Sequence, residues 1–338
     1  MANRYWVGGT ANWDGTAGTK WALTSGGAGG QAVPTSADDV FFDGNSGANT
    51  VTISTGNTGA KSITCTGFTG TLAGTAAITV SGSVTLVAGM TVTYSGALTL
   101  NATATLTSAG KTLGSLIVNG SGITVTLGDA LLLSSTITIT QGTFDTANFN
   151  LTADGLLSNN SNTRTITLGS STVTLVLHIN LWNTSTTTGL TFTSNTCTVS
   201  TTSNLSKTFN GGGFNFNGMT LNQGGSGALT ITGSNTFGAL SNSVQPTTFT
   251  FTAGTTTTVT NWNINGTAGN LVTIGSATAA SHTLSKSSGT VNSSFLSISN
   301  STATGGATWN AINSTDGGNN SGWIFSNTAT ANFLMFFN

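Results

Sequence analysis

Short runs in which polar and apolar residues alternate recur along most of the chain. The clearest is Thr136-Ile137-Thr138-Ile139-Thr140, and similar runs occupy residues 123–127, 166–168 and 229–231. A period of two places apolar side chains on one face of an extended strand. Apolar residues spaced by three and four are scarce, and the chain contains no Glu, which is a strong helix former. The sequence therefore predicts an all-β protein built from many short strands.

Charged residues are rare, with seven Lys plus Arg and eight Asp among 338 residues. Soluble proteins usually devote about a quarter of their residues to charge. A stack of similar coils explains the deficit, because like charges in successive layers would lie about 4.8 Å apart. The apolar runs between Ile63 and Leu175 also recur at intervals near 20 residues, with Gly at the intervening corners. We therefore predict a β-solenoid rather than a β-sandwich, whose strands usually recur every 8 to 12 residues or so.

The composition argues against several other classes of protein. Disordered chains are usually poor in aromatic residues, whereas this chain has 17 Phe and seven Trp. Its basic residues are scattered, so we expect no nucleic-acid binding. No apolar run approaches the length of a membrane-spanning helix, so we expect no membrane insertion. Cys65 and Cys197 lie far apart within strand-like segments, which predicts two buried thiols.

Both ends of the chain break the alternating pattern. Residues 1–46 hold three of the seven Trp and four of the eight Asp, and residues 304–338 again concentrate Trp and Gly. The ends of a solenoid are open sheet edges that need covers. We therefore predict an N-terminal capping segment at 1–46, β-helix coils at 47–303, and a C-terminal cap with an apolar tail at 304–338. The tail, Phe333–Phe337, is too apolar to remain exposed and predicts a homo-oligomer.

The two end segments also carry a family resemblance. They read Tyr5-Trp6-Val7-Gly8-Gly9 at the start and Asp316-Gly317-Gly318-Asn319-Asn320-Ser321-Gly322-Trp323-Ile324-Phe325 at the close. Both resemble segments of right-handed parallel β-helix proteins that are widespread in bacteriophage and prophage genomes. The resemblance implies a right-handed β-helix that serves as a tail-fibre, tail-spike or other virion-surface component.

This resemblance also implies where such a protein acts and with what. It would assemble in the host cytoplasm, be displayed on the exterior of the virion, and contact other virion proteins and a host cell-surface glycan. The N-terminal residues contain no apolar signal-peptide core, which agrees with that route. The alternatives are a bacterial extracellular β-helix adhesin or matrix filament protein, and a polysaccharide-cleaving tail spike.

Catalysis would require ionisable groups that this chain scarcely has. Glycoside hydrolysis generally needs a pair of carboxyl groups, and the mid-chain candidates lie in turn-like sequences where Asp commonly bonds its own backbone. Lyase chemistry would need basic groups gathered near an acid. The acidic candidates are Asp129, Asp145 and Asp154, and the dispersed basic ones are Arg164, His178 and Lys207. We therefore expect a non-enzymatic protein.

Two small groups of residues are candidate binding sites. Asp38, Asp39 and Asp43 form the one tight acidic group and are candidate ligands for calcium, the only cofactor that the sequence suggests. The alternative interpretation is a capping turn. Trp182 and Trp262 are each flanked by Asn, which makes them candidate lateral contacts for a glycan, with packing inside the coil as the alternative.

The many Thr-X-Thr triplets raise one more alternative. A flat ladder of Thr on one face of a solenoid could match an ice lattice. The intervals between triplets vary along the chain, so the sequence alone does not predict one regular face. Outward positions of strands are also often Thr simply because Thr favours the β conformation.

Overall fold

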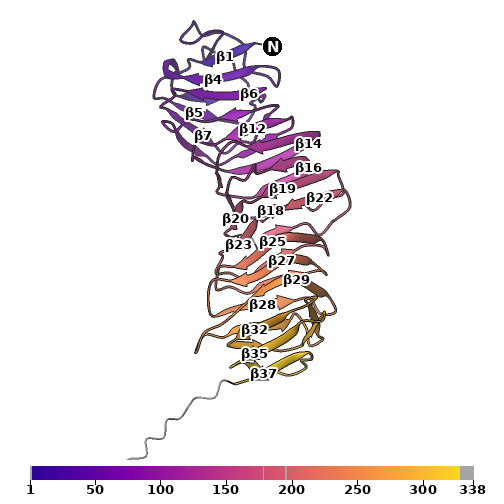
Figure 1. Ribbon diagram of the computed structural model, residues 1–338. Helices are drawn as coiled ribbons and strands as arrows, with labels where there is room; N and C mark the ends of the chain where they lie inside the picture. Colours follow the sequence, from indigo (N-terminus) through magenta and orange to yellow (C-terminus); the bar gives the residue numbers. More distant parts are fainter. Residues whose placement is uncertain (1, 178, 195, 328–338) are drawn as a thin grey trace, which may run out of the picture.

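The computed structural model describes residues 2–177, 179–194 and 196–327. The chain is 53% strand and 1% helix, and its strands form a parallel β-solenoid of about 12 turns. Figure 1 shows an elongated stack that runs from β1 at one end to β37 at the other. The predicted β-solenoid is confirmed, whereas the hand of its winding stays a prediction.

The largest sheet runs along the whole stack and contains 20 strands. They are β1 (Asn3–Trp6), β3 (Trp21–Ala22), β4 (Asp39–Asp43), β6 (Ser62–Thr66), β8 (Ile78–Val80), β9 (Val84–Thr85), β11 (Ala97–Leu100), β12 (Ala104–Thr107), β14 (Ser115–Leu127), β16 (Ile137–Asp145), β18 (Leu156–Leu157), β19 (Arg164–Gly169), β21 (Trp182–Asn183), β22 (Leu190–Ser194), β24 (Lys207–Asn210), β26 (Leu229–Thr232), β28 (Thr247–Phe251), β30 (Val272–Ser276), β33 (Leu296–Ile298) and β36 (Thr315–Asp316).

Three smaller sheets complete the coils. A four-stranded sheet holds β2 (Ala11–Trp13), β5 (Thr50–Ile53), β7 (Thr71–Gly74) and β10 (Thr91–Tyr94). A ten-stranded sheet holds β13 (Thr112–Leu113), β15 (Leu131–Leu133), β17 (Leu151–Ala153), β20 (Thr172–Leu175), β23 (Thr198–Thr201), β25 (Asn215–Gln223), β27 (Thr236–Asn242), β29 (Thr256–Asn263), β31 (His282–Ser285) and β34 (Ser301–Thr304). The last sheet holds β32 (Thr290–Ser294), β35 (Thr308–Ile312) and β37 (Trp323–Ser326).

Parallel pairing stacks apolar residues of successive coils directly above one another. One such column runs through nine strands of the largest sheet, and every member is buried. Its members are Ile78, Leu98, Leu116, Ile137, Leu156, Trp182, Phe209, Ile231 and Phe251. The alternating runs of the sequence thus become the inner and outer faces of the stack, because a one-residue shift of register would turn the apolar set outward.

The coils differ in length although their strands stay in register. Paired residues are 18 positions apart from Leu98 to Leu116 and 27 apart from Trp182 to Phe209. Aromatic residues fill the interior where the coils are long. The Trp182 and Phe209 rings stack with centroids 5.2 Å apart, and Phe216 lies edge-on to both.

Glycine allows β16 to turn a corner within one strand. The first half of β16 pairs with β18 and the second half with β19. Gly142 lies at the junction with a φ of 87°, and a Cβ atom there would approach the carbonyl oxygen of Gly120 to 2.5 Å. Only glycine meets both conditions without strain.

The end segments continue the stack. At the start, β1 pairs with β4 in parallel, and β3 covers its other edge in an antiparallel pairing. At the close, β37 pairs with β35. The division at 46/47 and 303/304, and the role of both segments as caps, stay predictions. The apolar tail Phe333–Phe337 lies outside the described residues.

The buried column of apolar residues predicts that two neighbouring substitutions in β14 lower the free energy of unfolding by different amounts. Leu116→Ala removes a fully buried side chain and should lower the free energy of unfolding by about 2 to 5 kcal/mol. Ile117→Ala, on the outward side of the same strand and only half-buried, should cost no more than about 1 kcal/mol. Urea unfolding followed by circular dichroism measures both, and equal costs would contradict the assigned register.

Candidate functional site

The three clustered carboxylates are each bound by groups of their own. The carboxylate of Asp38 accepts hydrogen bonds from the Ala2 N–H (2.9 Å) and the Thr35 N–H (3.1 Å) and hydroxyl (2.9 Å). Burial opposes its charged form, but the hydrogen bonds from Thr35 and Ala2 outweigh this and lower its pKa. Asp38 therefore anchors the start of the chain to the turn that precedes β4.

Asp39 and Asp43 hold other parts of the same region. The carboxylate of Asp39 accepts hydrogen bonds from the Ser62 hydroxyl (2.6 Å) and the Lys61 ammonium (3.1 Å) of the next coil. Asp43 caps the short 3₁₀ helix Gly44–Ser46, where its side chain accepts from the Asn45 and Ser46 N–H groups. Such capping is a structural role.

The three carboxylates do not form one metal-binding group. Within residues 2–177, 179–194 and 196–327, no group of three or more His, Cys, Asp or Glu side chains is placed to hold a metal ion. The arrangement favours the capping-turn interpretation of Asp38, Asp39 and Asp43, and the predicted calcium ligands are not brought together.

Both Trp residues predicted to contact a glycan lie inside the stack. The Trp182 side chain is fully buried and its indole N–H donates to the Thr184 hydroxyl at 3.0 Å. Trp262 is 8% exposed, and its indole N–H donates to the Ser293 hydroxyl at 3.0 Å. A buried ring offers no face to a sugar, so the structure does not support the predicted glycan contact at either residue.

The other Trp residues gather near the two ends of the stack. Trp6, Trp13 and Trp21 pack around Phe42 with ring centroids 5.0 to 6.5 Å apart. At the opposite end, Trp262, Trp309 and Trp323 form a second cluster with centroids 5.1 to 6.3 Å apart. These aromatic residues fill the interior of the terminal coils, where they add large apolar area.

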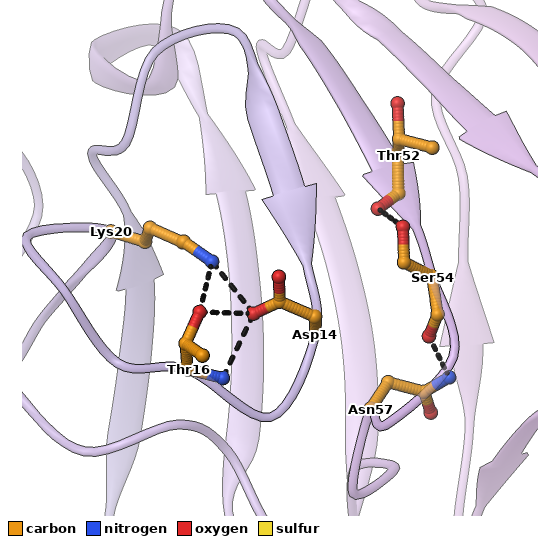
Figure 2. Close-up of polar contacts among 6 residues, drawn as sticks. All are labelled: Asp14, Thr16, Lys20, Thr52, Ser54 and Asn57. Atoms are coloured by element: carbon orange, nitrogen blue, oxygen red, sulfur yellow. Dashed lines mark hydrogen bonds and ion pairs between the residues drawn. The ribbon is translucent and has the colours of Figure 1, made fainter.

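An open groove of about 550 Å³ lies along the turn after β5 and the end of β7. It is lined by Thr52, Ile53, Ser54, Thr55, Gly74, Thr75 and Ala76. Figure 2 shows the adjoining turn, where the Ser54 hydroxyl donates to the Thr52 carbonyl and the Asn57 amide donates to the Ser54 carbonyl. The groove therefore offers hydroxyl groups and backbone atoms.

The charged groups beside this groove neutralise one another. Figure 2 shows Lys20 and Thr16 directed at the carboxylate of Asp14, and the Lys20 Nζ lies 2.7 Å from the Asp14 Oδ1. Hydrogen bonds from Lys20 and then Thr16 lower the pKa of Asp14 to about 2. The carboxylate is therefore a poor proton acceptor at neutral pH, and the groove suits neutral polar groups better than acid–base chemistry.

Three further ionisable side chains are buried where the alternating pattern calls for apolar residues. The Arg164 guanidinium is 1% exposed and is surrounded by the hydroxyl of Ser158 and the carbonyl groups of Ser158, Asn162, Thr186 and Thr188. Burial lowers its pKa, yet a guanidinium stays protonated in proteins. Arg164 thus binds together the loops of two successive coils.

Lys207 and His282 occupy similar inward positions. The Lys207 ammonium donates to the carbonyls of Ser203 (2.6 Å) and Gly227 (2.8 Å), and burial lowers its pKa to about 8. His282 stacks on Phe251 and its Nδ1 lies 3.0 Å from the Ser276 hydroxyl, whereas its buried Nε2 has no hydrogen-bond partner among the described residues.

The alternating pattern of the sequence already places these three residues at inward positions. Arg164, Lys207 and His282 each stand two positions before a buried apolar residue in an alternating run, at Ile166, Phe209 and Leu284. Sequence reasoning treated the first two only as dispersed catalytic candidates. His178, the third of the dispersed basic candidates, lies outside the described residues.

Cys65 and Cys197 are both buried thiols, as predicted, and burial raises the pKa of Cys65 to about 12.

A second cavity, about 20 Å³ and apolar, lies inside the N-terminal coils among Ile53, Tyr94 and Leu98. It is near the minimum size for one water molecule and lacks polar partners to hold it.

Comparisons with known proteins give no family assignment. No family model, no curated protein and no solved structure matches the chain. Among the described residues, no helix is long and apolar enough to cross a membrane.

The burial of His282 predicts a loss of stability in mild acid. Burial lowers the pKa of His282 to about 4 from an ordinary 6.5, so the unfolded chain takes up the proton first. The free energy of unfolding should therefore fall as the pH drops from about 6.5 to 4, by roughly 3 kcal/mol at most. Urea unfolding at several pH values measures this slope.

The variant His282→Phe is the matched control, because it keeps a ring against Phe251 but cannot be protonated. Its stability should vary much less between pH 6.5 and 4 than that of the unmodified protein. An identical pH dependence in both proteins would contradict the assignment to His282.

Proposed function

We propose that this chain is a non-enzymatic structural and adhesive component of a bacteriophage virion. It would be a fibre, spike or decoration protein that is displayed on the exterior of the particle and contacts the host surface. The fold carries the proposal. A solenoid of about 12 turns is an elongated body (Figure 1), and its strands are hydrogen-bonded between coils along the stack, which suits a rigid spacer or a lateral binding surface.

The phage assignment within this proposal rests on the end segments. Those segments, which resemble phage and prophage β-helix proteins, include β1 at one end of the stack and β36 and β37 at the other. The proposed partners are therefore other virion proteins, a host cell-surface glycan and further copies of the same chain. Self-association is proposed from the apolar sequence of the tail.

The placement of the mid-chain carboxylates supports a non-enzymatic role. Asp129 accepts hydrogen bonds from the Ser108 N–H (2.7 Å), the Ser108 hydroxyl (3.0 Å) and the Ala109 N–H (2.5 Å), so it fastens one coil to the previous one. Asp145 ends β16 and accepts from the Ala147 N–H at 2.8 Å. Asp154 follows β17, at another corner of the coil. Glycosidases instead hold two carboxyl groups face to face across one bond.

Particles released from a bacterial strain that carries this gene test the virion role. We expect the protein to co-purify with the particles through a density gradient and to be labelled on their exterior by immunogold electron microscopy. Its presence only on the surface of uninduced cells would instead indicate the bacterial adhesin. Absence from both would overturn the proposal.

Incubation with host capsule and lipopolysaccharide tests the non-enzymatic role. Light scattering after size exclusion should show glycan that is bound but not shortened, because Asp129 and Asp145 each bind backbone N–H groups of a turn. Depolymerisation that is lost in Asp145→Asn but kept in Asp154→Asn would assign catalysis to Asp145 and reject this part of the proposal.

A further inference from the structure

Five neighbouring strands of the largest sheet present two columns of short polar side chains on their outward side. The strands are β12, β14, β16, β19 and β22, and we call the nine residues the threonine array. One column contains Thr124, Thr143, Thr165 and Thr191, and the other contains Thr105, Thr126, Asp145, Thr167 and Thr193. Eight of the nine are threonines.

The array faces solvent on a rigid support. Residues that alternate with it, such as Val125, Phe144 and Ile166, are fully buried in the core, whereas the array residues are half-buried or exposed. Three of the strands are paired on both sides within the array, and no register shift falls between its paired residues. The positions of the side chains are therefore fixed before any ligand arrives.

Irregular spacing in the sequence becomes regular spacing in space. Successive members of the first column, Thr143, Thr165 and Thr191, are separated by 22 and 26 positions, yet they are direct partners in the sheet. Adjacent strands lie about 4.8 Å apart, and two residues along a strand span roughly 6.6 Å. The intervals between Thr-X-Thr triplets vary because the loops between the strands differ in length, while the strands themselves stay in register.

The hydroxyl groups of the array are available to a ligand. Among the described residues, none of its eight threonine side chains makes a hydrogen bond with another protein group. In part of the ten-stranded sheet, by contrast, outward polar groups bind one another. There the Asn222 amide donates to the Ser200 hydroxyl at 3.1 Å and accepts from the Ser241 hydroxyl at 3.0 Å.

We propose that the threonine array binds ice. Hydroxyl and methyl groups that repeat on a rigid sheet would hold water molecules in a repeating layer, which is how water is arranged at a crystal face of ice. A sugar ring would gain less, since the array contains no aromatic ring and no charged donor for its hydroxyls. The proposal does not depend on the virion role, because it concerns only this one face.

Asp145 interrupts the second column with a carboxylate. A charged group holds its own water strongly, so it should weaken the match to a crystal surface. Asp145→Thr would complete the column, and this gives the proposal a variant that is expected to gain activity.

Nanolitre osmometry of the purified chain tests the proposal through ice-crystal shaping and thermal hysteresis. We expect faceted crystals with the unmodified protein, loss of shaping with Thr165→Lys at the centre of the array, and increased hysteresis with Asp145→Thr. The control is Thr174→Lys on β20, which belongs to the same coil but lies in the ten-stranded sheet and should leave shaping unchanged.

Circular dichroism and the thermal midpoint show whether each variant is folded. Round, unshaped crystals with the folded unmodified protein at millimolar concentration would overturn the proposal. Equal losses in folded Thr165→Lys and Thr174→Lys would also overturn it, because binding would then not reside in the array.

Discussion

The structure depends on direct stacking of each coil upon the one before it. Parallel pairing in register places the side chains of paired residues over one another in neighbouring layers at about 4.8 Å. Apolar side chains gain from this arrangement, as the nine-residue column from Ile78 to Phe251 shows. Like charges do not, because they would repel along the whole stack. The scarcity of charge and the dominance of Thr, Ser, Asn and Gly follow from this one constraint.

The few interior charges are placed where this constraint can be met. The cations of Arg164 and Lys207 are bound by carbonyl groups and a hydroxyl from neighbouring loops, and no carboxylate takes part in those bonds. Backbone carbonyls are supplied at every layer of a solenoid, so a buried cation can be solvated without a second buried charge. Such groups hold loops together at the cost of desolvating a charge.

Much of the fold was predictable because alternation and stacking leave local traces. Runs such as Thr136–Thr140 predicted strands and the side chains that face inward, and the intervals near 20 residues indicated coils. The sites were harder to predict. Asn beside Trp182 and Trp262 suggested exposed rings, yet both rings are buried. Each Trp stands at an inward position of its strand, and the polar neighbours on either side do not change that. Asp38, Asp39 and Asp43 are close in sequence, but strand alternation and a tight turn direct them to different partners.

Because the coils differ in length, the spacing between layers does not depend on the number of residues in each coil. The strands set a fixed pitch, whereas the loops between them absorb the difference between an 18-residue and a 27-residue repeat. Insertions at the rim can therefore accumulate without changing the axial position of any layer. In evolution or in design, the loops of such a molecule can therefore be exchanged while the distances between its layers stay constant.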